Sequence, residues 1–194
     1  MTQPRFDLVI GNGTLIDGTG AAPRSADLGI SDGRIAAIGD LAQADAAQRI
    51  DAHRNVVCPG FIDAHSHSDL TLLSDGRGLS KVHQGVTTEI VGNCGLGVAP
   101  VASRDAIAGI RDAIYIVDPD PSVPWTWQSM ADYLRVVDDS GVSINVAPLA
   151  GHLSIHASVM GVCRPSPRRE TNCAACRRCS TTLSATAPSA SRPA

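Results

Sequence analysis

Aromatic residues are scarce in this chain, at only 3% of 194 residues, whereas hydrophobic residues make up 43% and charged residues 18%. That balance allows a buried core and argues against general disorder. No apolar run approaches the roughly 18 residues that cross a bilayer. The net charge is only −3, which argues against a nucleic-acid-binding surface. The opening residues 1–5 are not followed by an apolar segment of the secretory type, so we expect a soluble cytoplasmic protein with no membrane or nucleic-acid partner.

Residues 163–194 differ sharply in composition from the rest of the chain. They hold six arginines, one acid (Glu170) and four of the six cysteines, and Leu183 is their only large apolar residue. Such a segment buries too little apolar surface to offset its ordering entropy. We therefore predict that it is disordered.

Three interpretations of this tail compete. It could be a basic interaction arm. It could be a metal knuckle, although Cys173, Cys176 and Cys179 have no nearby histidine and form an incomplete zinc set. The interpretation that we favour is a frameshift, because codons for residues 179–194, read two bases out of phase, can encode a helix followed by a short strand. A single lysine, Lys81, against 15 arginines indicates GC-rich codons and fits the bases that this requires.

Short β-type runs alternate with turn signals from residue 6 to residue 58. The pair Asp32-Gly33 lies between two alternating runs and is a strong hairpin signal. Cys58, which precedes a proline, is expected to pack in the core. Residues 1–58 are therefore predicted to form a small antiparallel β-layer, with strands over 6–10, 14–17, 26–30, 34–39, 48–52 and 55–58.

The pattern changes at residue 59. Strands are predicted over 61–65, 86–91 and 142–149, with a helix over 127–137 before the last of them. A strand, a connection, a strand, a helix and a strand indicate parallel βα units over residues 59–162. Three such strands cannot close an eight-stranded barrel.

His65 and His67 are the most informative local pattern. Residues i and i+2 of a strand lie on the same side, so both imidazoles converge. Neutral imidazoles suit a divalent metal such as zinc. An H-x-H pair alone is weak evidence for a metal site, and its neighbours in the sequence decide its weight.

Residues 59–69 resemble the signature of the amidohydrolase superfamily, in which a small β-layer precedes a PGFID-x-H-x-H strand. Residues 7–20, 32–35 and 50–52 are similar to the β-layer that leads into that strand. Residues 84–95, QGVTTEIVGNCG, narrow the resemblance to the N-acyl-D-amino-acid deacylase (D-aminoacylase) branch. Over residues 6–162 it implies an α/β fold: an N-terminal β-sandwich portion, then the first three strands of a metal-dependent (β/α)8 TIM barrel.

The resemblance implies that His65, His67 and Cys94 are ligands of zinc, with one tight ion and room for a second, weak one. A thiolate is a good zinc ligand, and a divalent metal lowers the thiol pKa enough to deprotonate it. The alternative is that Cys94 is a small buried residue, the usual place of a free cysteine.

Three further polar residues are expected near the two histidines and Cys94. Asp63 and Asp69 are expected to orient the two histidines by accepting hydrogen bonds. His152 follows the third strand and, by resemblance, borders the pocket. No motif surrounds the remaining histidines, which are expected at the surface: His53, His83 and His156.

The implied reaction is metal-assisted hydrolysis of the amide of an N-acyl-D-amino acid, a small molecule, to a carboxylate and a free D-amino acid. The catalytic aspartate and two further histidine ligands would lie on later strands, so we expect an N-terminal fragment that is inactive alone. Two alternatives stay open. One is another cyclic-amide amidohydrolase of the dihydroorotase or hydantoinase type, and the other is a non-catalytic metal-binding module that uses the cysteine-rich tail.

Overall fold

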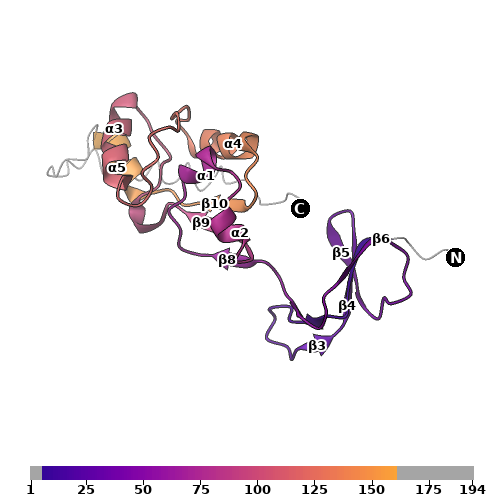
Figure 1. Cartoon of the computed structure of the whole chain (residues 1–194). Helices are drawn as coiled ribbons and strands as arrows, with labels where there is room; N and C mark the ends of the chain where they lie inside the picture. The colour runs from indigo at the N-terminus through magenta and orange to yellow at the C-terminus, as the bar shows by residue number, and fades with distance from the viewer. Residues whose placement is uncertain (1–5, 161–194) are drawn as a thin grey trace. The chain divides into compact units, whose positions relative to one another are not determined.

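The structure of the chain, a computed structural model, describes residues 6–160 as two units that divide between Pro59 and Gly60 (Figure 1). Strands and helices are mixed, as the sequence predicts. Across the described residues no helix is long and apolar enough to cross a membrane. The tail predicted to be disordered, residues 163–194, lies outside the described residues.

Two small sheets make up the first unit. One has the strand order β5-β4-β1-β6, and the other has the order β3-β2-β7. The strands of the first sheet are β1 (Phe6–Gly11), β4 (Asp27–Ser31), β5 (Arg34–Gly39) and β6 (Ala46–Asp51). Those of the second are β2 (Thr14–Leu15), β3 (Arg24–Ser25) and β7 (Val56–Val57).

The predicted hairpin is confirmed, because β4 and β5 pair antiparallel across Asp32 and Gly33. Both turn residues have positive φ, 50° and 68°, as a tight two-residue hairpin turn requires. The prediction of a purely antiparallel layer is wrong, since β6 pairs parallel with β1 and β7 pairs parallel with β2. Cys58 is also exposed rather than packed in a core, since it lies beyond the end of β7, next to the division between the units.

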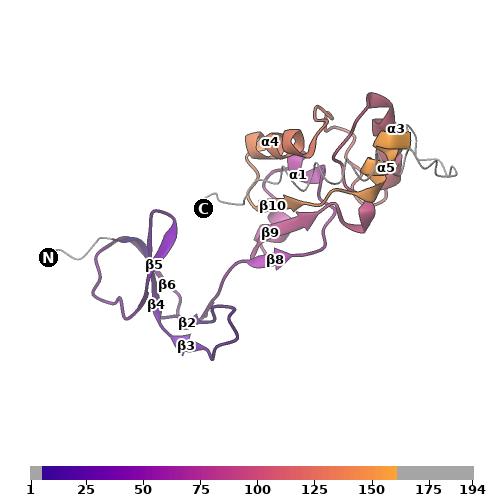
Figure 2. The same cartoon turned by 180° about the vertical axis from the view of Figure 1, so that it is seen from behind.

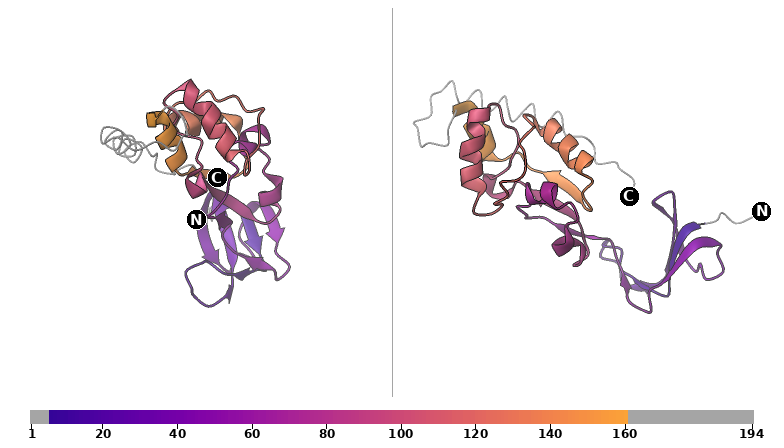
Figure 3. Two further views of the ribbon diagram at one scale, coloured as in Figure 1. Left: turned by 90° about the vertical axis from the view of Figure 1, so that its left-hand side faces the viewer. Right: turned by 45° about the horizontal axis from the view of Figure 1, so that its top comes forward.

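The second unit is built on a parallel sheet with the order β10-β9-β8 (Figure 2). Its strands are β8 (Phe61–Asp63), β9 (Val86–Val91) and β10 (Asn145–Pro148), so the predicted parallel pairing is confirmed. Figure 3 shows α3 and α5 side by side. Over residues 60–160 the helices are α1 (Thr71–Ser74), α2 (Leu79–Val82), α3 (Arg104–Ile114), α4 (Met130–Ser140) and α5 (His152–Met160), with one 3-10 turn, η1 (Asn93–Gly95).

Helix α4 starts later than the predicted residue 127 because its cap lies at Ser129. The Ser129 hydroxyl accepts the N–H of Asp132, and the Asp132 carboxylate accepts the N–H of Ser129, which is a capping box. The helix ends at Ser140 because the next residue, Gly141, has a φ of 65° that breaks the helical path. Trp127 therefore precedes the helix, and its indole donates to the carbonyl of Val98 in the core.

The core of the second unit lies between the helices and the segment after β9. Trp127 and Tyr133 are almost fully buried, with ring centroids 5.2 Å apart in an edge-to-face arrangement. The Tyr133 hydroxyl donates to the backbone carbonyl of Asp69 at 2.8 Å. This bond anchors the chain just after His67 to the core.

Candidate metal centre

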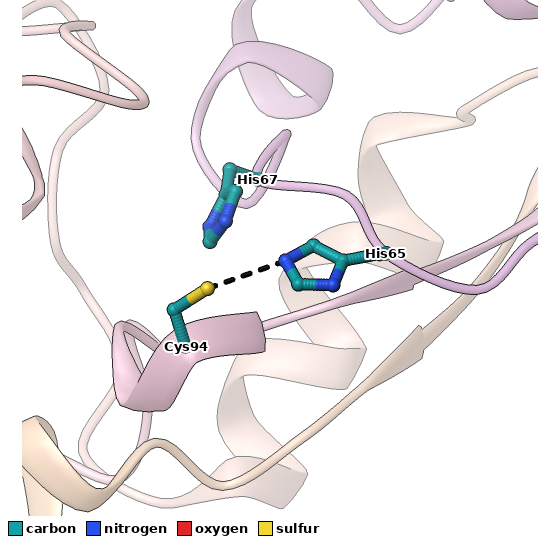
Figure 4. Close-up of side chains that lie close together, drawn as sticks. All are labelled: His65, His67 and Cys94. Atoms are coloured by element: carbon teal, nitrogen blue, oxygen red, sulfur yellow. Dashed lines mark hydrogen bonds between the residues drawn. The ribbon is translucent and has the colours of Figure 1, made fainter.

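His65, His67 and Cys94 come together beyond the ends of two neighbouring parallel strands. The histidines follow β8, and the cysteine follows β9. One ligand atom from each of the three lies within 4.8 Å of the others. The Nε2 atom of His65 lies 3.2 Å from the Sγ atom of Cys94, and both face His67 (Figure 4). The structure therefore brings together the three residues that the sequence singles out.

The donor set fits a divalent metal such as zinc. Two imidazoles and one thiol are ligand types that zinc prefers. The Nδ1 atom of His67 is buried and has no hydrogen-bond partner among residues 6–160. Cys94 is exposed, so the alternative of a small buried residue is not what the structure shows. Buried polar atoms are normally paired, and a ligand would give the Nδ1 atom of His67 a partner.

A sharp turn after β9 directs Cys94 towards the histidines. Gly92 and Gly95 have φ of 78°, and Cys94 itself has φ of 56°. The left-handed region costs an L-residue roughly 1–2 kcal/mol, so Cys94 is held in a strained backbone conformation. Gly92 also permits a close approach, because a Cβ atom there would lie 2.5 Å from the carbonyl oxygen of Leu149.

Hydrogen bonds join the histidine segment to the end of β9. The N–H of Ser66 donates to the carbonyl of Ile90 at 3.0 Å. The Asn93 side-chain amide donates to the carbonyls of Ser66 and Ile90, at 3.3 and 2.7 Å. The carboxylate of Asp69 accepts the N–H of Gly92 at 3.1 Å. Asn93 is thus a structural residue that the sequence reasoning missed, although its place between Gly92 and Cys94 is a signal.

Asp63 acts on the backbone of His65 rather than on an imidazole, which differs from the expectation. Its Oδ1 atom accepts the N–H of His65 at 3.1 Å, and its Oδ2 atom accepts the ammonium of Lys81 at 2.5 Å. The bond from Lys81 holds the pKa of Asp63 below its usual value. The same ammonium lies 3.2 Å from the buried carboxylate of Glu89. Sequence reasoning missed Lys81 and Glu89, although a single acid inside a β-branched strand could have indicated Glu89.

Comparison with known proteins identifies the family. Residues 48–190 match the model of the amidohydrolase family. A D-aminoacylase from Alcaligenes xylosoxydans xylosoxydans is 42% identical over 159 residues, which is 82% of this chain. The chain belongs to the amidohydrolase family.

Solved structures of this family share the fold. An N-acyl-D-glutamate deacylase from Bordetella bronchiseptica, complexed with zinc and a phosphonate mimic of the tetrahedral intermediate, has a TM-score of 0.77 at 34% identity. A D-aminoacylase studied for its binuclear metal centre has a TM-score of 0.78 at 36% identity. Both alignments cover 93% of this chain and 36% of the other. The chain spans about a third of the length of these amidohydrolases, and the resemblance seen in its motifs is confirmed.

Asp69 is buried in this amidohydrolase chain. The residue is 3% exposed, and burial raises the pKa of its carboxyl to about 7. One oxygen accepts the N–H of Gly92, and the other has no hydrogen-bond partner within the described residues. Asp69 therefore joins the histidine segment to the turn that carries Cys94, and it accepts no hydrogen bond from either imidazole there.

His152 begins α5 and is exposed. Its Cβ atom lies 3.5 Å from where a Cβ of Gly95 would be, so it borders the turn that carries Cys94. It is not part of the three-residue cluster. His53 and His83 are exposed, as expected, whereas His156 is half-buried, with its ring 5.9 Å from that of His152.

Proposed function

We propose that this chain is the N-terminal part of a metal-dependent N-acyl-D-amino-acid deacylase. Such an enzyme hydrolyses the amide of an N-acyl-D-amino acid to a carboxylate and a free D-amino acid. The observation that carries the proposal is the cluster of His65, His67 and Cys94, with ligand atoms within 4.8 Å. D-aminoacylase and N-acyl-D-glutamate deacylase relatives support this substrate class.

We propose that β8, β9 and β10 are the first strands of a (β/α)8 barrel. The three strands pair parallel, and their order in the sheet is the same as their order in the chain. Helices lie between β9 and β10 in the sequence, as they do in a (β/α)8 barrel. The cluster lies beyond the carboxyl ends of β8 and β9, where barrel enzymes carry their active sites. The division between Pro59 and Gly60 supports a β-sandwich portion over 1–58 and an incomplete barrel over 59–162.

We propose zinc as the metal, held by His65, His67 and Cys94. The zinc complex of the Bordetella bronchiseptica deacylase supports this choice, and the binuclear centre of the D-aminoacylase supports a second metal site. When bound, zinc polarises a carbonyl group and lowers the pKa of a bound water. Cys94 would bind as the thiolate and release its proton, so metal affinity should fall at low pH.

The metal site is tested by zinc titration of the 194-residue chain, with four tail cysteines replaced by serine so that their thiols cannot contribute: Cys163, Cys173, Cys176 and Cys179. We expect weak but measurable zinc binding, because two further ligands would lie on later strands, and we expect Cys94→Ser and His67→Ala each to abolish it. The matched control is Cys58→Ser, because Cys58 is also free and exposed but lies in the other unit. Equal zinc binding after Cys94→Ser would refute the site. Binding only with the tail cysteines intact would favour the metal-binding module.

The activity is tested on N-acetyl-D-amino acids and their L-enantiomers with zinc present. Two proteins are compared: the 194-residue chain and a version with the reading frame after codon 162 restored to the favoured phase. We expect turnover of D-substrates by the restored protein alone, since it would add the later strands and the remaining ligands. Comparable turnover by the 194-residue chain would refute the fragment interpretation. A restored protein that is soluble but inactive would refute the proposed deacylase activity.

A further inference from the structure

We propose that Lys81 is a positioning residue of the metal centre, which holds the His65 backbone in place through Asp63 and ties β8 to β9 through Glu89. The inference rests on the proposed metal site of the deacylase. It assigns a role to a side chain in α2 that belongs to none of the motifs carrying the metal ligands.

The first link runs from Lys81 through Asp63 to His65. Both oxygens of the Asp63 carboxylate are used, one by the backbone N–H of His65 and the other by the Lys81 ammonium. The two charged side chains are only about a quarter exposed, at 25% and 26%. Charge-assisted bonds in such surroundings are stronger than those of surface pairs. Lys81 therefore orients the carboxylate that fixes the start of the histidine segment.

The second link runs from Lys81 to Glu89. Asp63 and Glu89 are register partners on the parallel strands β8 and β9. Glu89 is 0% exposed, and neither of its oxygens has a hydrogen bond among residues 6–160. Two adjacent carboxylates on neighbouring strands repel each other. The ammonium lies 2.5 Å from one and 3.2 Å from the other, so it offsets this repulsion.

The two links together act on the geometry of the cluster. β8 leads to His65 and His67, and β9 leads to Cys94. Lys81 forms ion pairs with a carboxylate on each of these directly paired strands, so it ties them together near the ends where the ligands begin. Groups that orient metal ligands from outside the coordination sphere typically contribute 10- to 100-fold to metal affinity.

The test is a Co²⁺ titration of the 194-residue chain with the tail cysteines replaced by serine. The absorption band of thiolate-to-cobalt charge transfer reports the bond to Cys94 directly. We expect Lys81→Met to weaken Co²⁺ binding about 10- to 100-fold, and Lys81→Arg, which keeps the charge, to recover most of the loss. Arg77→Met is the matched control, because Arg77 forms a nearby but exposed ion pair with Asp75 and should leave binding unchanged.

A second variant separates positioning from folding. Lys81→Met leaves the buried Glu89 carboxylate without a counter-charge. The double variant Lys81→Met with Glu89→Gln has a neutral amide there instead, so it should fold like the parent by circular dichroism. We expect its Co²⁺ affinity to stay low, because Asp63 still lacks its anchor. Asp63→Asn should reproduce the loss and add little to Lys81→Met, as members of one network do.

The outcomes that overturn the proposal are distinct. Parental Co²⁺ affinity in the folded double variant would mean that Lys81 only compensates a buried charge. Unchanged affinity in Lys81→Met, with the charge-transfer band intact, would refute the positioning role and leave the metal site standing. If the parent chain shows no charge-transfer band, or if its band survives Cys94→Ser, the metal site is refuted, and the positioning role of Lys81 with it.

Discussion

Gly92 is the position at which a single methyl group should disturb the candidate site most. Its φ of 78° costs an alanine roughly 1–2 kcal/mol. The new Cβ atom would also lie 2.5 Å from the backbone oxygen of Leu149, so one of the two segments must shift. Overpacking of this kind typically costs about 1–3 kcal/mol. Gly92→Ala should therefore lower the free energy of unfolding by about 2–5 kcal/mol.

Gly95→Ala is the matched control. Gly95 has the same φ of 78°, but its added Cβ would meet only the Cβ and the backbone nitrogen of His152, at ordinary distances of 3.5 and 3.8 Å. This variant should therefore lose only the roughly 1–2 kcal/mol of the left-handed backbone. The difference between the two variants isolates the contact between the Gly92 turn and the end of β10.

Urea unfolding followed by tryptophan fluorescence measures both variants. The chain has two tryptophans, Trp125 and Trp127, and both lie in the second unit, so the signal reports that unit alone. The same proteins are titrated with Co²⁺, and Gly92→Ala should bind more weakly because the shifted turn carries Cys94. Equal losses of stability in the two glycine variants, within about 0.5 kcal/mol, would refute the close approach.

Three further predictions concern hydrogen bonds. Tyr133→Phe leaves the buried carbonyl of Asp69 unpaired and should cost about 1–2 kcal/mol in urea, so an unchanged midpoint would contradict the bond. Ser129→Ala breaks the capping box of α4 and should cost about 1 kcal/mol at neutral pH. The backbone N–H of Ser129 lowers the pKa of Asp132 from 3.8 to about 2. The contribution of this carboxylate to stability should therefore be complete above pH 3.8 and should be lost as the pH falls through about 2. Acid titration monitored by circular dichroism checks this, and Asp132→Asn should remove that pH dependence. Asn93→Ala removes two bonds between the histidine segment and β9 and should weaken Co²⁺ binding about tenfold, whereas parental affinity would show that the turn holds Cys94 without them.

Local chemistry in the sequence was enough to predict several features. Asp32-Gly33 predicts a hairpin because both residues tolerate the positive φ that the turn requires. The β-branched run 86–91 predicts a strand, and the structure has one over the same residues. The two histidines converge as predicted, although they lie beyond the end of β8 and not on the extended strand from which the prediction was argued. Cys94 follows its strand within a glycine-rich turn, which predicts that it is exposed beyond the strand end. Each of these inferences depends on residues that are neighbours in the chain.

Other features depend on segments that are distant in the chain, and only the tertiary structure decided them. Turn signals describe each reversal of the chain but not which strand a later segment joins, so the parallel pairing of β6 with β1 was not predicted. Asp63 lies 18 residues from Lys81, and its partner could be identified only once α2 was placed against the sheet. Glu89 is buried because β9 is the central strand of its sheet, a position that its own sequence does not encode. An ion pair forms where two side chains meet in space, and that meeting is set by the packing of whole elements rather than by the residues alongside them.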